Sequence, residues 1–201
     1  MTGKGSLNHN SRKFHAKNTD PNRTHWNVEY CNEDIKDVYH ELFDEALKRY
    51  NDKQTRKDRK IDDYYEKIRS GKQEKLFHEV ILQIGDKDNM GSETMEGQLA
   101  AKILDEYMKG FQERNPTLRV FAAHLHLDEA TPHLNIDFIP YVTGSKRGLD
   151  TRVSLKQALS SLGFKGGSRS ETELNQWVQS EKEKLAMVMR ENEIEWDQKG
   201  T

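Results

Sequence analysis

The spacing of apolar residues changes within the first third of the chain. In the stretch HWNVEYC, Trp26, Val28 and Tyr30 alternate with polar side chains, and this period of two predicts a half-buried strand. From residue 34 onwards, apolar residues recur every three or four positions, which predicts an amphipathic helix with Asn32 as its N-cap. A second helix is predicted over residues 61–68, after an exposed connection that shows no periodicity.

The middle of the chain repeats this change of period. β-Branched and aromatic residues predict a strand over residues 75–85, and Ser92 is placed to cap a long helix that closes at Asn115. The apolar face of this helix comprises Met95, Leu99, Ile103, Leu104, Tyr107, Met108 and Phe111. Two more strands are predicted over residues 118–127 and 133–142, joined by a tight turn.

The last quarter of the chain predicts two helices, a short one after Ser154 and a charged one from about residue 171. Strands in pairs between long helices favour an α+β fold, in which an antiparallel β-sheet is flanked by helices. A length of 201 residues fits a single domain. We expect its core in residues 1–145, followed by a basic loop and a charged C-terminal helix in residues 146–201.

The composition excludes several classes of protein. Apolar and charged residues each make up 33% of the chain, and the mean hydropathy is -1.00. No apolar stretch is long enough to span a membrane, and the N-terminus lacks the apolar centre of a signal peptide. The single cysteine, Cys31, cannot form an internal disulfide, which fits a reducing compartment. These features predict an intracellular protein.

The net charge of -2 conceals two basic segments, residues 1–25 and 143–169. Each contains a single acidic residue, and their basic residues are Lys4, Arg12, Lys13, Lys17 and Arg23 in the first, and Lys146, Arg147, Arg152, Lys156, Lys165 and Arg169 in the second. Local basic surfaces on a nearly neutral protein can attract a polyanion. A merely solvated loop has the same composition, so the charge alone leaves both interpretations open.

The two strands around the turn concentrate polar residues on one face. If Asp128 to Thr131 form a four-residue loop, antiparallel pairing places His126 opposite His133 and His124 opposite Asn135. Leucine and other apolar side chains then occupy the opposite face, so a slip of one residue would exchange the two faces. The alternation therefore specifies this register strongly.

Imidazoles that face each other across a hairpin are close enough to bind one divalent ion. An oxygen of Asn135 or Glu129 would complete the ligand set. Hard oxygen donors lie nearby and no thiolate does, so Mn²⁺ or Mg²⁺ fits this ligand set, while Zn²⁺, Co²⁺ and Ni²⁺ remain alternatives. A solvent-facing hairpin whose histidines only pair with carboxylates is the structural alternative.

Open positions on such an ion would suit a phosphate oxygen, and a nucleophile would then be needed nearby. The basic N-terminal segment supplies His9 and, three residues later, Arg12. An imidazole can attack phosphorus directly, and a carboxylate such as Glu129 or Asp128 could orient its other nitrogen. Composition alone favours a flexible surface residue of the N-terminus as the interpretation of His9.

Two stretches of the sequence resemble the motifs of a known protein family. The stretches HLDEATPH and NHNSRKFHAKNTDPNRTHWNVEY resemble the MobV (Mob/Pre) family of plasmid mobilisation relaxases, HUH-type endonucleases that nick one DNA strand at an origin of transfer. The family signature HxDExTPHxH corresponds here to His126, Asp128, Glu129, Thr131, Pro132, His133 and Asn135. The N-terminal HNxR motif corresponds to His9, Asn10 and Arg12, and NRTHWN resembles a second block with Arg23 and Asn27. The resemblance covers roughly the first 145 residues.

The resemblance implies that His9 is the nucleophile and forms a covalent bond to the 5′-phosphate of the nicked strand. It implies metal ligation at positions 126, 133 and 135, single-stranded and hairpin origin-of-transfer DNA as partner, relaxosome or coupling proteins, and a bacterial cytoplasmic location. Relaxases of this kind usually continue further, so we expect an excised catalytic domain. The expected DNA-contacting residues are Arg12, Lys13, Arg23, Trp26, Asn27, Lys146, Arg147 and Arg152.

The sequence departs from the family at Asn135, where the family has histidine. An amide oxygen can replace the nitrogen donor, or His124 could substitute from across the hairpin. Asp137 lies two residues further along the same face and could hydrogen bond to a ligand. The departure also leaves open a DNA-binding homologue that has lost cleavage.

A tyrosine nucleophile is the mechanistic alternative, as in HUH replication initiators or transposases. Tyr64 and Tyr65 form an adjacent pair beside basic residues. Their spacing from Ile61 and Ile68 is that of residues packed on one face of a helix, so the periodicity favours a structural role for this pair.

Overall fold

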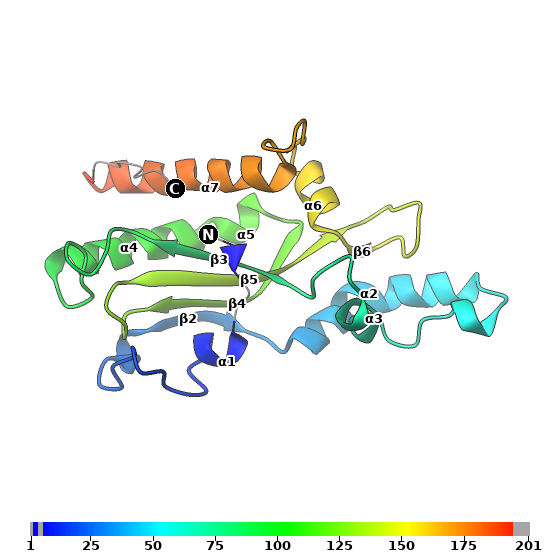
Figure 1. Ribbon diagram of the computed structural model, residues 1–201, viewed down its shortest axis with the longest axis horizontal. Helices are drawn as coiled ribbons and strands as arrows, with labels where there is room; N and C mark the ends of the chain where they lie inside the picture. Colours follow the sequence, from blue (N-terminus) through cyan, green and yellow to red (C-terminus); the bar gives the residue numbers. More distant parts are fainter. Residues whose placement is uncertain (1, 4–5, 195–201) are drawn as a thin grey trace.

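A computed structural model describes residues 2–3 and 6–194 of the chain (Figure 1). Lys4, one of the basic residues of the N-terminal segment, lies outside the described residues. Within them, the strands are β1 (Thr2–Gly3), β2 (Val28–Asn32), β3 (His78–Gln83), β4 (Leu118–His126), β5 (His133–Val142) and β6 (Arg152–Val153). They form an antiparallel sheet in the order β1-β3-β5-β4-β2, with β6 paired to β5.

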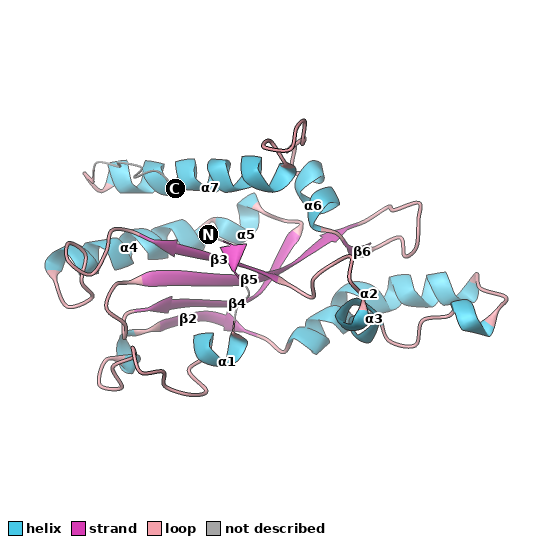
Figure 2. Ribbon diagram, viewed as in Figure 1, coloured by secondary structure: helices cyan, strands magenta, loops and turns pink. Residues whose placement is uncertain are grey.

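Helices flank this sheet, as the sequence predicts (Figure 2). They are α1 (Leu7–Asn10), α2 (Ile35–Asp52), α3 (Tyr64–Ser70), α4 (Met95–Lys109), α5 (Phe111–Arg114), α6 (Leu155–Ser161) and α7 (Glu173–Glu191), with the 3-10 turns η1 (Thr24–Trp26) and η2 (Lys57–Arg59). The predicted α+β class with an antiparallel sheet is confirmed. No helix within residues 2–3 and 6–194 has the length and apolarity needed to cross a membrane.

Four local predictions were wrong. Trp26 ends a 3-10 turn and precedes the strand, which starts at Val28. Asp34, rather than Asn32, caps α2, because its side chain accepts a hydrogen bond from the amide of Lys36. Thr94 caps α4 in place of Ser92 and bonds the amide of Gly97, and Met95 is 86% exposed instead of joining the apolar face. Capping residues compete over a few positions, and periodicity does not choose among them.

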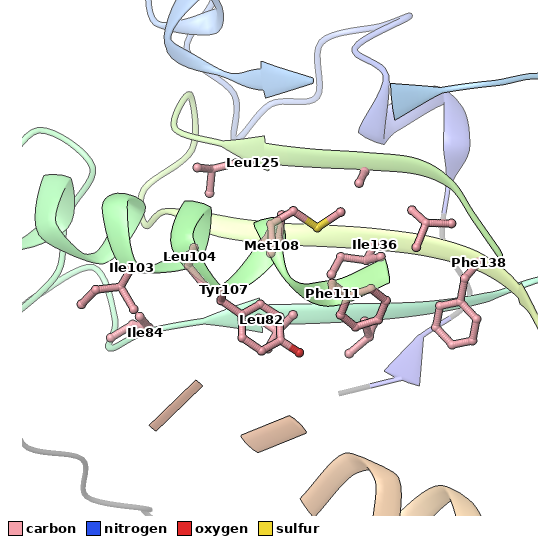
Figure 3. Packing of buried hydrophobic residues seen from close by; sticks show 14 of the residues in the cluster. Leu82, Ile84, Ile103, Leu104, Tyr107, Met108, Phe111, Leu125, Ile136 and Phe138 are labelled. Atoms are coloured by element: carbon pink, nitrogen blue, oxygen red, sulfur yellow. The ribbon is translucent and has the colours of Figure 1, made fainter. Parts of the chain in front are cut away.

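One face of the sheet packs against α4, α5, α6 and α7. Phe138 and Ile136 of β5 lie against the apolar face of α4 and α5 (Figure 3). Trp177 of α7 is fully buried, and its ring contacts those of Phe111 and Phe138. The buried Glu181 accepts hydrogen bonds from the hydroxyl of Tyr107 and the amide of Asn115, which fixes α7 against α4.

The other face of the sheet is divided into an apolar and a polar half. Helices α2 and α3 lie toward the end of the sheet that is far from the β4–β5 turn (Figure 1), and they bury Phe121 and Ile139 there. A β-bulge between Val120 and Ala122 shifts the register of β4 within this half. The half of the face next to the β4–β5 turn carries the histidines, and the N-terminal segment covers it.

Candidate active site and metal centre

The β4–β5 hairpin has the register predicted from the sequence. His126 pairs with His133, and His124 pairs with Asn135. Leu125 and Leu134 project to the opposite face, into the core formed with α4. The imidazole rings of His126 and His133 have their centroids 5.1 Å apart, so the two candidate metal ligands lie side by side.

The polar face of the hairpin is buried, although a solvent-facing patch was one interpretation of the sequence. His124, His126 and Asn135 are 4%, 1% and 5% exposed. The cover comes from the N-terminal segment, whose short helix α1 is anchored by the buried Asn10. The amide nitrogen of Asn10 donates to Glu79 Oε1 at 2.8 Å and to Asp137 Oδ2 at 3.1 Å.

This anchoring carries His9 to the turn of the hairpin. His9 Nε2 lies 3.3 Å from Glu129 Oε1 and 3.4 Å from Arg12 Nη1. Glu129 Oε1 also lies 3.8 Å from His133 Nε2, so one carboxylate joins the candidate nucleophile to a candidate metal ligand. Of the two carboxylates proposed to orient His9, the structure places Glu129 beside it.

Asp128 instead pairs with Arg12 in a buried, two-pronged ion pair. Arg12 Nε and Nη2 lie 2.9 and 2.6 Å from the two Asp128 oxygens, and Nη2 lies 2.9 Å from Glu129 Oε1. The side chains of Arg12 and Asp128 are 8% and 0% exposed. Burial opposes ionisation of Asp128, but the hydrogen bonds and charge of Arg12 outweigh it and lower the pKa of this carboxyl to about 2.

A φ of 51° at Arg12 turns the chain at the end of α1, in the left-handed region that non-glycine residues rarely occupy. This turn directs the Arg12 guanidinium back toward the hairpin, where it also donates to the carbonyl of His9 at 2.9 Å. A strained backbone at a residue that bonds to both carboxylates is typical of a functional site.

Three further residues fix the turn between β4 and β5. Arg23 donates to the carbonyls of Leu127 and Glu129, and Asn27 Oδ1 accepts from the amides of Leu127 and Asp128. Ser92, predicted to cap a helix, donates its hydroxyl hydrogen to the Glu129 carbonyl. Arg23 and Asn27 thus hold the hairpin in place, and their predicted contact with DNA stays a prediction.

The surroundings of the two paired histidines leave ring nitrogens available to a metal ion. Both nitrogens of His126 are buried without a hydrogen-bond partner in the described part of the chain. His133 Nδ1 lies 3.0 Å from the Thr131 carbonyl, which can only accept, so the hydrogen sits on Nδ1 and the lone pair of the neutral ring would be on Nε2. Burial, followed by the charge of Arg12, lowers the pKa of His126 to about 2, so this ring stays neutral.

Asn135 is the candidate for the third donor. Its Oδ1 is buried and has no partner among the described residues, whereas its Nδ2 donates to Glu79 Oε1 at 2.9 Å. Within residues 2–3 and 6–194, no three His, Cys, Asp or Glu side chains form a group that could hold a metal ion. The third position here is an amide, so a set of His126, His133 and Asn135 fits a divalent ion only if the amide oxygen takes part.

His124 is less suited to replace Asn135. Its ring stacks parallel to that of His126 at 5.8 Å, and its Nε2 lies 3.3 Å from Glu29 Oε2. Two stacked rings direct their nitrogens side by side rather than toward a common point. His124 therefore packs beside the candidate metal centre, and its service as a ligand stays a prediction.

Sequence reasoning missed Glu79 and gave no role to Asn10. Glu79 is 3% exposed and pairs with Asp137 across β3 and β5. Burial and the nearby Glu79 raise the pKa of Asp137 to about 7. Alternation along β3 could have placed Glu79 on a polar face, but the sequence does not say that β3 neighbours β5.

The predicted DNA-contacting residues fall into two groups. Lys13 and Phe14 are exposed just after His9 in the chain, and the Phe14 ring, 50% exposed, lies 5.8 Å from that of His9. Trp26 is also exposed and lies at the end of the 3-10 turn that precedes β2. Arg147 and Arg152 line a pocket of about 620 Å³ with Lys67 and Lys72. Lys146 is exposed beside this pocket.

The basic pocket lies at the far end of the sheet from the histidines. Arg152 pairs with Val142, nine residues along β5 from His133, which corresponds to about 30 Å at about 3.3 Å per residue. None of its four basic side chains makes an ion pair in the described part of the chain.

The alternative tyrosine pair is part of the core. Tyr64 is buried against Tyr39 and Phe43, and its hydroxyl accepts a hydrogen bond from the amide of Val153. Tyr65 packs edge-on against Tyr39. Both belong to the cluster under α2 and α3, away from the β4–β5 turn (Figure 1), as their helical spacing indicates.

Comparison with solved structures identifies the fold. Two crystal structures of the MobM relaxase domain (MOBV; Mob_Pre), one at pH 5.5 and one at pH 4.6, match the chain. Both are bound to Mn and to 22-nucleotide oriT DNA of plasmid pMV158. The first has 23% identity and a TM-score of 0.52, and the match covers 96% of this chain and 81% of the MobM domain chain. The second has 22% identity and a TM-score of 0.53, with 96% and 82% covered. No curated protein sequence matches the chain.

The model of the Mob_Pre family, described as plasmid recombination enzyme, matches residues 5–186. This match extends well beyond the two motifs on which the resemblance was based and covers most of the chain. The predicted relationship to the MobV (Mob/Pre) proteins is confirmed: the chain belongs to the Mob_Pre family of plasmid recombination enzymes.

Proposed function

We propose that this protein is a relaxase that nicks single-stranded origin-of-transfer DNA during mobilisation of a plasmid or integrative element, with His9 as its nucleophile. The observation that carries the proposal is the position of His9, held between Glu129 and Arg12 next to the histidine face of the hairpin. Family membership and a fold shared with MobM, which binds oriT DNA, support the substrate class.

The proposed reaction is a transesterification. Glu129 faces Nε2 of His9, so an N–H at that position would donate to the carboxylate and leave Nδ1 with the lone pair for attack. A P–N bond forms to the 5′-phosphate as the P–O3′ bond breaks, and the leaving 3′ oxygen takes up a proton. Glu129 stabilises the positive charge that the ring gains during attack. The P–N bond retains the energy of the diester, so religation needs no nucleotide triphosphate.

The residues that would hold a divalent ion are His126, His133 and Asn135. When bound, such an ion polarises the scissile phosphate and offsets the charge that develops on it. Manganese in the MobM structures and the mixed nitrogen and oxygen donors support Mn²⁺, with Mg²⁺ as the alternative. The Arg12 guanidinium, buried with Asp128, fixes both hairpin carboxylates and so holds His9 in line.

DNA would pass over exposed residues of the N-terminal region that includes His9. Lys13 can contact a backbone phosphate, and Phe14 and Trp26 offer exposed rings for base stacking. The basic pocket at the far end of the sheet suits the backbone of the flanking DNA, including a hairpin. We place this activity in the bacterial cytoplasm, within a single catalytic domain of residues 1–201, with relaxosome or coupling proteins as further partners.

The test is covalent capture of DNA. The protein is incubated with Mn²⁺ and labelled single-stranded oligonucleotides from the transfer origin of its parent element, and adducts are resolved before and after acid treatment. We expect an acid-labile adduct that disappears in His9→Ala. His15→Ala is the matched control, because His15 is an exposed histidine of the same basic segment.

Each other outcome contradicts part of the proposal. An adduct that persists in His9→Ala and resists acid would assign the nucleophile to a tyrosine. Binding of the oligonucleotides without any adduct, in the presence of each candidate metal, would identify a DNA-binding homologue that has lost cleavage.

A further inference from the structure

Glu79 contacts both the candidate metal ligand and the helix that carries the candidate nucleophile. One oxygen, Oε1, accepts from Asn135 Nδ2 at 2.9 Å and from Asn10 Nδ2 at 2.8 Å. All three side chains are at most 5% exposed, so water cannot substitute for these bonds. None of the sequence motifs includes Glu79.

A carboxylate can accept hydrogen bonds but cannot donate them, whereas an amide has one end of each kind. Contact with Glu79 therefore decides which way the Asn135 amide faces. The NH₂ group points to Glu79, and Oδ1 points to the opposite side, where it is buried without a partner in the described part of the chain. The reverse orientation would bring Oδ1 against the carboxylate oxygen, two acceptors in contact without water.

We propose that Glu79 is a positioning residue that fixes the Asn135 amide with its oxygen toward the metal centre, and so makes this asparagine a hard oxygen ligand. The inference rests on the metal centre of the proposed function. Only the oxygen of an amide binds a divalent ion well, because the lone pair of its nitrogen is delocalised. Oxygen donors favour Mn²⁺ or Mg²⁺ over softer ions. The Glu79 carboxylate thus contributes to metal choice without touching the metal.

The bond from Asn10 to the same oxygen gives Glu79 a second task that can be separated from the first. Asn10 precedes the turn at Arg12 and anchors α1, so loss of its bond to Glu79 should displace His9. Asn10 Oδ1 also accepts a longer hydrogen bond from Asn135 Nδ2, at 3.4 Å, but the 2.9 Å bond from Asn135 to Glu79 does not involve Asn10 and should keep the amide in its orientation. Asn10→Ala is therefore expected to reduce nicking while metal affinity stays unchanged. This variant distinguishes the two effects of Glu79.

The experiment measures Mn²⁺ affinity in the absence of DNA, from the electron paramagnetic resonance signal of free Mn²⁺. Glu79→Gln keeps the shape of the side chain but allows it to donate to Asn135 Oδ1, so the amide is no longer held in one orientation. We expect Mn²⁺ binding to weaken by about 10-fold, at the lower end of the effect of changing a residue that orients a metal ligand.

Two controls separate orientation from loss of charge. Glu29→Gln removes a carboxylate from the same face of the sheet, 3.3 Å from His124, without contact to Asn135, and should leave Mn²⁺ affinity unchanged. In an Asn135→Asp background either carboxylate oxygen can bind the metal ion, so the side chain does not need to be held in one orientation. There, Glu79→Gln should no longer weaken binding.

The outcomes are decisive for the inference. Wild-type Mn²⁺ affinity in a folded Glu79→Gln variant would overturn it. An equal loss with Asn135 present and in the Asn135→Asp background would also overturn it, because it would indicate a charge effect alone. Circular dichroism of each variant monitors folding. Failure of the wild type to nick DNA would contradict the proposed function, but the metal affinities would still test the role of Glu79.

Discussion

The buried pair of Arg12 and Asp128 gives the sharpest quantitative prediction for stability. Asp128→Asn removes one charge, keeps the shape of the side chain and leaves the Arg12 guanidinium buried next to Glu129. Removing one partner of a buried ion pair costs about 3–5 kcal/mol. The lowered pKa of Asp128, about 2 against an ordinary 3.8, corresponds by itself to about 2 kcal/mol. Since Glu129 remains to pair with Arg12, we expect a loss of about 2–4 kcal/mol near neutral pH.

The sign of the pH dependence follows from the lowered pKa. The unfolded chain takes up a proton at Asp128 at higher pH than the folded protein does, so the stabilisation is complete above about pH 4 and is lost as the pH falls toward 2. The free energies of unfolding of wild type and variant should therefore differ by a constant amount from pH 7 to about pH 5 and converge at lower pH.

Urea unfolding, followed by circular dichroism at several pH values, measures this difference. The matched control is Asp150→Asn, because Asp150 forms an equally two-pronged pair with Arg49, but on the surface. Water screens that pair, so its loss should change stability far less. A loss below about 1 kcal/mol for Asp128→Asn near neutral pH, or a difference that grows in acid, would refute the reasoning.

Two further predictions concern pH and DNA binding. Burial, and secondarily Lys75, lowers the pKa of His78 to about 4, so the stability that depends on its neutral form is complete above about pH 6.5 and is lost as the pH falls toward 4. His78→Phe retains ring stacking on Phe138 and should make the urea midpoint less dependent on pH across this range. The same pH dependence in variant and wild type would contradict the role given to His78. Phe14→Ala should weaken binding of single-stranded origin DNA by about 1–3 kcal/mol in a fluorescence anisotropy titration, through loss of base stacking. Equal affinity of variant and wild type would exclude this ring from the DNA interface.

The local pattern of apolar and polar residues determined much of the secondary structure of this protein. Alternation of apolar and polar residues fixed the register of β4 and β5, because a slip of one residue would place the leucines on the polar face and the histidines in the apolar core. This pairing of His126 with His133 was predictable from the hairpin alone. Helical spacing likewise assigned Tyr64 and Tyr65 to packing, and their burial agrees with that interpretation.

Tertiary structure decided how the distant parts of the site meet. Asn10 and Glu79 are separated by 69 residues and Asn10 and Asp137 by 127, and no periodicity relates such positions. Only the order of strands in the sheet places β3 next to β5, and only the packing of α1 on their polar face brings His9 to Glu129. The sequence therefore determined which side chains share a strand face, since that depends on backbone geometry within a few residues. The orientation of the Asn135 amide depends on a carboxylate from another strand, which non-local packing alone supplies.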